Sequence, residues 1–182
     1  MTVNGGKLYG PKQSGMLYVK SGIELEPMVY GGGQERGLRS GSENLAQIIG
    51  FSTALQKAQA VRAEEVDRLH ILQQLFYNLL ERYVPAAQVN GHRKHRLPNN
   101  VHITLDGHDN ERLIMILDEQ GICAAAGSAC SASSDEPSHV LKAMGMTSGQ
   151  ISGSLRFTMG RQTTQEDVER LVAALSDILA QN

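Results

Sequence analysis

The sequence predicts an α/β fold in which a short sheet is covered by helices. Short apolar runs bounded by glycine, serine or asparagine have the composition of β-strands. Longer segments between them repeat apolar residues at steps of three and four, which is the period of an amphipathic helix. At 41% apolar residues, the 182-residue chain can bury a core.

The expected strands are short and lie in both halves of the chain. Residues 2–4 have the form of a strand end before a tight glycine turn. The other expected strands are 16–19, 27–30, 101–105, 122–125 and 154–159. In the last of these, side chains alternate between two faces, so Arg156 lies on the face opposite Leu155 and Phe157.

The expected helices account for most of the remaining chain. They are residues 42–84, as one long helix or as two with a kink, then 110–120, 137–145 and 163–179. Gly121 and Gly145 are typical helix stops. A Thr163-x-x-Glu166 pattern predicts a capping box at the start of the last helix.

Composition narrows the class of protein. The net charge is -2 and the pI is near 6.3, which excludes a basic surface for nucleic acid or an anionic membrane. The short basic run 92–96 is interpreted as a solvated loop. No apolar run approaches the ~20 residues of a spanning helix, and the first residues do not resemble a signal peptide. Two cysteines form no disulfide framework, so a reducing cytoplasm is expected.

Three side chains are candidates for covalent amino-acid chemistry. Cys130 lies in a run of small residues, 127–134, which predicts an exposed loop thiol and not a packed one. Lys7 follows Gly5 and Gly6, and a lysine with room around it can hold an aldehyde cofactor. A surface lysine in a turn is the simpler interpretation. Arg156 either pairs with an acidic side chain or binds a carboxylate through two hydrogen bonds.

Two further features have competing interpretations. Ser40 and Glu43 have the spacing of a capping box, but exposed N–H groups at a helix start also bind phosphate. The triple glycine at 31–33 favours the phosphate. Cys123 follows Ile122 in an apolar stretch and is expected to pack in the core. The histidines have no metal-ligand spacing, so no metal site is expected.

The motifs together resemble those of cysteine desulfurases. The glycine-rich segment 31–44 (GGGQERGLRSGSEN) resembles their signature, and 127–133 (GSACSAS) resembles their active-site cysteine loop. The long form of that loop marks the branch that serves iron–sulfur cluster and nitrogenase assembly. Further collinear matches are 7–12, 97–100, 136–141 and 154–157. The resemblance covers essentially the whole chain.

The resemblance implies a class V pyridoxal 5'-phosphate (PLP) enzyme of fold type I. Lys7 is then the Schiff-base lysine and Cys130 the nucleophile that takes sulfur from L-cysteine. Arg156 holds the substrate carboxylate, and Ser42 reaches the cofactor phosphate across a homodimer. The implied products are L-alanine and a Cys130 persulfide, which passes to an iron–sulfur scaffold or another acceptor such as the tRNA-thiolation pathway.

Residues 1–43 are expected to be the end of the large PLP-binding domain, and 44–182 a small α/β domain. Family members are about twice this length, so the chain is expected to be the C-terminal half of such an enzyme. The family has Ser-x-His before its lysine, whereas Asn4 and Gly6 stand at those places here. Weak or absent cofactor binding is therefore expected of the chain alone.

Two alternatives stay open at this point. One is another class V enzyme, such as an aminotransferase or a selenocysteine lyase, which shares the lysine but does not require the cysteine loop. The other is a non-catalytic module that dimerises, binds sulfur-transfer partners or carries a persulfide made elsewhere. Substitution of Cys130 separates the first alternative from a desulfurase, because another class V enzyme should keep its turnover in Cys130→Ala.

Overall fold

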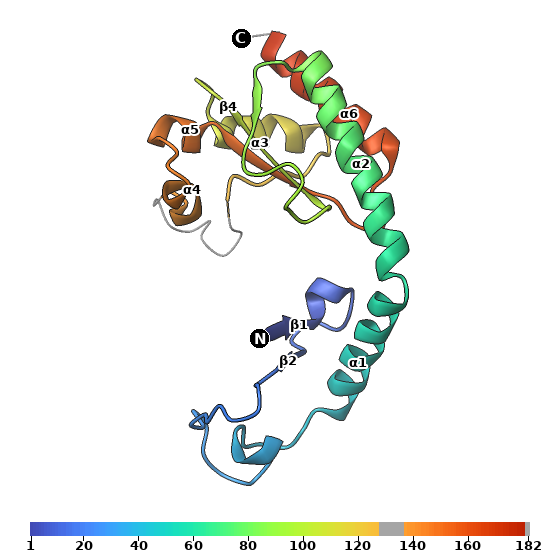
Figure 1. The fold of residues 1–182 in the computed structure, drawn as a ribbon, viewed down its shortest axis with the longest axis vertical. Helices are drawn as coiled ribbons and strands as arrows, with labels where there is room; N and C mark the ends of the chain where they lie inside the picture. Colours follow the sequence, from blue (N-terminus) through green and yellow to red (C-terminus); the bar gives the residue numbers. More distant parts are fainter. Residues whose placement is uncertain (128–136, 181–182) are drawn as a thin grey trace. The chain divides into compact units, whose positions relative to one another are not determined.

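The computed structural model describes residues 1–127 and 137–180 of the chain (Figure 1). The chain divides into two compact units, Met1–Ala63 and Glu64–Asn182. Each unit contains helices and a small antiparallel sheet, which confirms the mixed α/β fold class. The division by compactness places residues 44–63 with the first unit, whereas the domain interpretation from the sequence begins its second domain at residue 44.

The first unit combines a two-stranded sheet with one long helix. In chain order its elements are β1 (Thr2–Asn4), the 3-10 helix η1 (Gly5–Leu8), β2 (Gly15–Leu17), the 3-10 helix η2 (Glu35–Gly37) and α1 (Leu45–Ala60). Strands β1 and β2 pair antiparallel with Val3 opposite Met16. The expected strand at 27–30 is wrong, because these residues form bends and irregular backbone.

Close approaches at glycines attach the η1 turn to α1. A Cβ on Gly10 would lie 2.8 Å from the Cβ of Ala54, and one on Gly50 would lie 2.5 Å from Cγ of Pro11. Only residues without a side chain permit this spacing. In this unit Phe51 is the one buried large apolar residue, so its own core is small.

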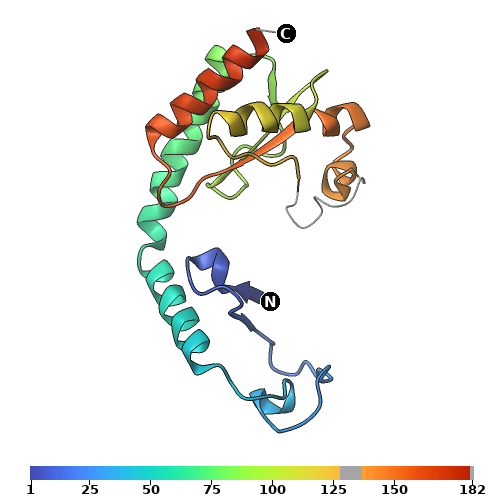
Figure 2. The same cartoon turned by 180° about the vertical axis from the view of Figure 1, so that it is seen from behind.

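The second unit is a three-stranded sheet packed against helices. Its elements are α2 (Arg62–Tyr83), which starts in the preceding unit, then β3 (Ala87–Val89), β4 (Asn100–Leu105), α3 (Asn110–Glu119), α4 (His139–Ala143), α5 (Ser148–Ser152), β5 (Ser154–Thr158) and α6 (Gln165–Ala180). The strand order is β3-β4-β5, and both pairs are antiparallel. Figure 2 shows this unit from behind, with α6 and α2 running alongside each other.

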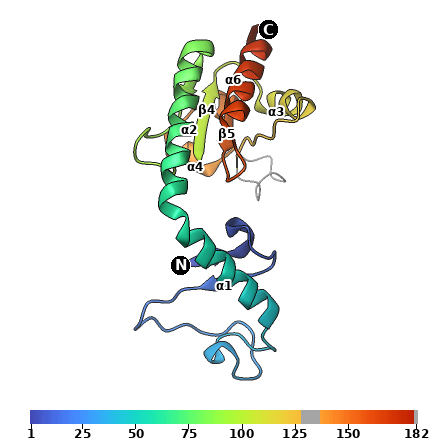
Figure 3. The same cartoon turned by 90° about the vertical axis from the view of Figure 1, so that its right-hand side faces the viewer.

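One face of this sheet is apolar and carries the core. Val101, Ile103 and Leu105 of β4 alternate inward and are fully buried, and Leu155 and Phe157 of β5 join them. Apolar side chains of α2, α3 and α6 complete the cluster. Figure 3 shows these three helices beside β4 and β5. The other face is polar, and α5 covers the part of it that holds Thr104 and Ser154.

The segment that leads into β5 contains a very close backbone approach. A Cβ on Gly153 would lie 2.3 Å from the carbonyl oxygen of Leu105, and the Leu105 N–H donates to the Gly153 carbonyl at 2.9 Å. A side chain at this position has no space, so glycine is required for β4 and β5 to start their pairing here.

Most expected helices are present, with local corrections. The long helix is two, because α1 ends at Ala60 and α2 begins at Arg62. Gly121 and Gly145 follow α3 and α4 with positive φ, as helix stops do. The box at α6 is one residue later than expected: Thr164 and Asp167 exchange hydrogen bonds, and Thr163 accepts from the Gly160 N–H instead.

Two short elements, β3 and α5, were not expected, and one expected strand was nearly absent. Residues 122–125 contribute a single bridge, between Ala125 and Arg156. Strand β3 begins two residues after Pro85, and its three residues have no alternation long enough to recognise. Helix α5 starts with a capping box in which Thr147 and Gln150 exchange hydrogen bonds.

Candidate functional site

A row of polar side chains crosses the polar face of the second unit's sheet. Asn90 follows β3, His102 lies in β4, and Arg156 lies in β5 directly opposite His102. The Asn90 N–H donates to the His102 carbonyl, which makes these two neighbours in the ladder. The three residues share a face because the alternation that buries Val101 and Ile103 turns His102 the other way.

His102 and Arg156 form a non-hydrogen-bonded pair of the antiparallel ladder. The backbone bonds of Arg156 go to Ala125 on the far edge, and those of His102 include Asn90 on β3. Non-hydrogen-bonded pairs have the shorter Cα separation, about 4.5 Å, and hold their side chains closer together. The imidazole and the guanidinium are therefore immediate neighbours.

The His102 imidazole is neutral at physiological pH. Burial first, and then the guanidiniums of Arg96 and Arg156, together lower its pKa from 6.5 to about 4. Its Nδ1 lies 2.8 Å from Nδ2 of Asn90, an amide nitrogen that can only donate. Nδ1 is thus the acceptor, and the ring proton is on Nε2.

Arg156 has an unused hydrogen-bond donor. Its Nε is buried and has no hydrogen-bond partner among the described residues. No described carboxylate pairs with the guanidinium, so the sequence alternative of an acidic partner has no support in the described residues. A buried donor without an acceptor is costly, and a ligand oxygen would satisfy it.

Arg96 organises the end of the polar face. One Nη donates to the Asn90 carbonyl at 3.1 Å and to the Tyr77 hydroxyl at 3.3 Å, and the other donates to Oδ1 of Asn100 at 3.1 Å. The run 92–96 is therefore not a wholly solvated loop. Arg96 is partly buried and fixes the backbone at Asn90.

Lys7 lies on an ordered turn of the first unit. Asn4 caps η1, because its Oδ1 accepts from the Gly6 N–H at 2.8 Å. Gly5 is buried, and a Cβ there would lie 2.1 Å from Oγ of Ser14. The Lys7 side chain is exposed. Asn4 and Gly6, which stand where the family has serine and histidine, therefore build the turn that carries the lysine.

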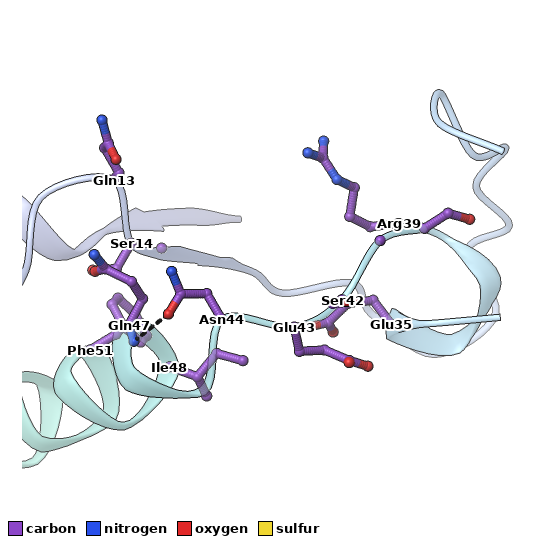
Figure 4. A pocket seen from close by; sticks show the side chains of 13 residues that line it. Gln13, Ser14, Glu35, Arg39, Ser42, Glu43, Asn44, Gln47, Ile48 and Phe51 are labelled. Atoms are coloured by element: carbon purple, nitrogen blue, oxygen red, sulfur yellow. Dashed lines mark hydrogen bonds between the residues drawn. The ribbon is translucent and has the colours of Figure 1, made fainter. Parts of the chain in front are cut away.

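Ser42 lines a surface pocket before the start of α1 (Figure 4). Arg39, Glu35 and Glu43 also line the pocket, and the Oε1 atom of Gln47 is buried there with no hydrogen-bond partner among the described residues. The pocket thus carries both signs of charge. A phosphate at this place stays a prediction.

The expected capping box at Ser40 and Glu43 is wrong. Helix α1 begins at Leu45, and Asn44 is its N-cap, with Oδ1 accepting from the Gln47 N–H at 3.2 Å. Ser40 donates to the Gly32 carbonyl instead, at 2.7 Å. This bond connects the triple glycine to the segment that carries Ser42.

The structure tests the prediction for only one of the two cysteines, Cys123. Cys130 lies outside the described residues, so its role as nucleophile stays a prediction. Cys123 is exposed, and the expectation that it packs in the core is wrong. It follows the chain reversal at Gly121 and points outward, while its neighbours Ile122 and Ala124 contact the core. Among described residues, no cluster of histidine, cysteine and acidic side chains could hold a metal.

The sequence did not identify His102, Asn90 and Arg96 as site residues. The available signal was the alternation in 101–105, which places a histidine on the open face of its strand. Lys7 and Ser42 belong to the first unit and Arg156 to the second, and the structure joins Arg156 with His102.

Comparison with known protein families identifies the class of protein to which this α/β fold belongs. The family model of class-V aminotransferases matches residues 1–171, and the chain belongs to this family. In the part of the chain that is described, no helix is long and apolar enough to cross a membrane.

The curated relatives are cysteine desulfurases. One from Archaeoglobus fulgidus is 41% identical over 180 residues, 98% of this chain and 47% of the relative. One from Methanosarcina thermophila is 40% identical, over 98% of this chain and 44% of the relative. The chain therefore spans about half the length of the relatives it matches.

Solved structures agree with the fold. A NifS-like protein superposes with a TM-score of 0.87 at 26% identity, over all of this chain and 46% of that one. A NifS-like protein from Rickettsia africae gives 0.86 at 29% identity, over 98% and 47%.

Proposed function

We propose that this chain supplies the C-terminal part of a PLP-dependent cysteine desulfurase. The reaction converts L-cysteine to L-alanine and leaves the sulfur as a persulfide on Cys130. The observation that supports this most is the similarity to cysteine desulfurases, at 37–41% identity over nearly the whole chain in four such relatives. The unused donor of Arg156 supports a carboxylate substrate independently.

The residues of the first unit fit two requirements of a phosphorylated aldehyde cofactor. Lys7 offers an exposed primary amine on a turn that Asn4 and Gly5 make rigid, and it would hold the aldehyde. Ser42 offers a hydroxyl beside the start of α1, where helix N–H groups favour an anion. When bound, PLP supplies an electron sink for removal of the substrate Cα proton. Lys7 would carry that proton.

Arg156 would orient the substrate. Its guanidinium lies on the polar sheet face beside the neutral imidazole of His102, and no described carboxylate of the chain competes for it. Two parallel N–H donors match the two oxygens of a carboxylate, and this geometry fixes the direction of the amino acid.

Cys130 would accept the sulfur. Its Sγ forms a bond to the sulfur of L-cysteine while the substrate Cβ–S bond breaks and Cβ takes up a proton. L-cysteine and the thiol thus give L-alanine and the persulfide, and no external oxidant or reductant is needed. We further propose a cytoplasmic homodimer that delivers this sulfur to an iron–sulfur scaffold or another acceptor protein.

The test is persulfide formation on the chain. Purified chain is mixed with PLP and L-cysteine, with and without a polypeptide spanning the remaining part of the Archaeoglobus relative, and the mass of the Cys130 peptide is measured. We expect one added sulfur with the complementing polypeptide, and little without it. The Cys130→Ala variant should lose the product and Cys123→Ala should keep it.

The cofactor assignment has its own control. A visible absorption band on adding PLP to the complemented chain should disappear in Lys7→Ala and persist in Lys12→Ala, a neighbouring exposed lysine. Loss of the band in both variants, or in neither, contradicts the role of Lys7.

A second candidate is a non-catalytic module that dimerises or carries a persulfide made elsewhere. The exposed apolar side chains of the first unit, such as Met28 and Tyr30, favour it, because large exposed apolar surfaces mark interaction sites. Another class V activity, such as that of a selenocysteine lyase or an aminotransferase, is a further alternative. If turnover of an amino acid survives Cys130→Ala, the chain has another class V activity. If a persulfide is transferred onto Cys130 without PLP, the chain is a non-catalytic carrier.

A further inference from the structure

Three hydrogen-bond donors on the polar sheet face have no described acceptor. Two are the buried Nε–H groups of Arg156 and of Arg96, which lies at the end of the face. The third is Nε2–H of His102, whose Nδ1 is already engaged by Asn90. Because Nδ1 faces β3, the proton on Nε2 points away from that strand, and β5 with Arg156 is the strand on the other side of β4.

Asn90 determines which ring nitrogen carries the proton. Its amide has two N–H groups, and one donates to Nδ1 of His102 while the other donates to Oγ1 of Thr104, both at 2.8 Å. Arg96 fixes the Asn90 backbone from the opposite side by donating to its carbonyl at 3.1 Å. The amide therefore cannot rotate to release Nδ1 without losing both bonds.

The polar row formed by Asn90, His102 and Arg156 has positive charge near it and no described negative charge to balance it. The charged groups that act on His102 are the guanidiniums of Arg96 and Arg156. Arg96 donates hydrogen bonds only to uncharged acceptors among the described residues, on Tyr77, Asn90 and Asn100. No described carboxylate pairs with either arginine. Partly buried cations without a counter-ion favour an anion at their open donors.

We propose that His102 is a second ligand of the substrate carboxylate, with its Nε2–H donating to one carboxylate oxygen while the guanidinium of Arg156 binds the same group. This inference rests on the proposed function, which assigns the carboxylate to Arg156. Asn90 is a positioning residue that acts through His102. The ligand class is an α-amino acid, because the donors of Arg156 and His102 lie on neighbouring strands and can meet the two oxygens of one carboxylate.

The test uses the full chain labelled with nitrogen-15 and sodium acetate as the probe, with methylammonium chloride as control. The Nε–H resonance of Arg156 and the ring nitrogens of His102 are followed near neutral pH. We expect both residues to shift with one shared dissociation constant. Methylammonium should shift neither.

Four variants resolve the contributions. His102→Phe should weaken acetate binding by about tenfold, the effect of one hydrogen bond to a charged group. His102→Gln, which keeps a donor, should recover most of that loss. His92→Gln, in the exposed basic run, should change nothing. Asn90→Ala should change the nitrogen-15 shifts of His102 from one tautomer to a mixture, a readout that a purely structural role would not produce.

The outcomes separate this inference from the proposed function. If Arg156 responds to acetate and His102 does not, or if His102→Phe binds acetate as tightly as the unaltered chain, the inference fails and the role of Arg156 stands. If Arg156 does not respond, both fail. The titration of the unaltered chain decides the matter even if one variant does not fold.

Discussion

The two units of this chain differ in how much of their apolar surface they bury. In the second unit, a continuous cluster extends from α2 through β4 and β5 to α6, and Leu105, Leu117 and Leu175 have no exposed surface. In the first unit, Phe51 is the buried large apolar side chain. Exposed ones there are Met1, Tyr9, Met16, Leu17, Tyr18, Ile23, Leu25, Met28, Val29, Tyr30, Leu38, Leu45, Ile48, Ile49 and Val61.

This difference in burial bears on where the two proposed binding functions lie, since the carboxylate-binding residues belong to the second unit and the cofactor-binding residues to the first. Arg156 and His102 lie on a sheet that its own core holds in place, so their arrangement needs no other polypeptide. Lys7 and Ser42 lie on segments with little core beneath them. Large exposed apolar surfaces mark interaction sites. Carboxylate binding is therefore expected to be a property of the chain, and cofactor binding a property that needs complementation.

The largest expected contrast is in hydrogen exchange. Amides of β4 and β5 should open only with the unit as a whole, whereas those of β1 and β2 should exchange through local opening. We expect protection factors to differ by about a thousandfold or more, since global unfolding costs about 5 kcal/mol or more. Exchange of the full chain, followed by mass spectrometry of peptides, measures this. Equal protection in the two sheets would contradict the contrast.

Core truncation should show the next largest effect. Phe76, 1% exposed, packs against Phe157 in the second unit's core with ring centroids 5.6 Å apart. Phe76→Ala should lower the free energy of unfolding by about 3–5 kcal/mol, through lost burial and a cavity. Urea denaturation followed by circular dichroism gives the value. The matched variant Phe51→Ala should leave that main transition nearly unchanged, and an equal loss would show that the units unfold as one.

A smaller effect depends on pH. The His102 pKa falls from 6.5 to about 4 on folding, because the ring is buried beside two guanidiniums. Above pH 6.5 the imidazole is neutral in both states. As pH falls toward 4 the unfolded chain binds the proton more readily, so folding loses stability. We expect a loss of about 1–2 kcal/mol, reduced by solvent screening.

The check is urea denaturation near neutral pH and near the folded pKa of His102. The variant His102→Gln should lose less stability over that interval, whereas His92→Gln should behave like the unaltered chain. A pH dependence that is the same in all three proteins would exclude His102 as its origin.

The smallest expected effects on stability come from substitutions at helix N-caps, one in each of the two units. Thr147 caps α5 in the second unit and Asn44 caps α1 in the first. Thr147→Ala should lower the free energy of unfolding by about 1 kcal/mol. Asn44→Ala should instead increase exchange at the start of α1 without moving the main unfolding transition. A shift of that transition by Asn44→Ala would connect α1 to the second unit's stability.

Predictions from sequence succeeded where one pattern determined the structure. Strand β4 and helix α6 have alternation or helical period over enough residues to be recognised, and their buried residues match that pattern. Strand β3 has three residues and depends on pairing with β4, which is tertiary information. The cap of α1 was misassigned because Ser40 and Asn44 both fit a helix start, and the Ser40 bond to Gly32 decides between them.

The site was predictable only in part for the same reason. Arg156 was found because a charged residue between Leu155 and Phe157 stands out along one strand. The relation of His102 to Arg156 depends on the register between two strands that are far apart in the sequence. The role of Asn90 depends on which of its side-chain atoms faces the ring. Neither register nor amide orientation is encoded in local periodicity.

Gly153 has a consequence for how this sequence can vary. A methyl group there would collide with the Leu105 carbonyl, at the bond where β4 and β5 begin to pair. Arg156 is three residues further along β5. An alanine at position 153, among the mildest exchanges in the genetic code, would therefore displace Arg156 from His102 without altering either. Many surface positions of this chain can therefore vary in evolution, whereas position 153 must remain glycine if the arrangement of Arg156 and His102 is to be kept.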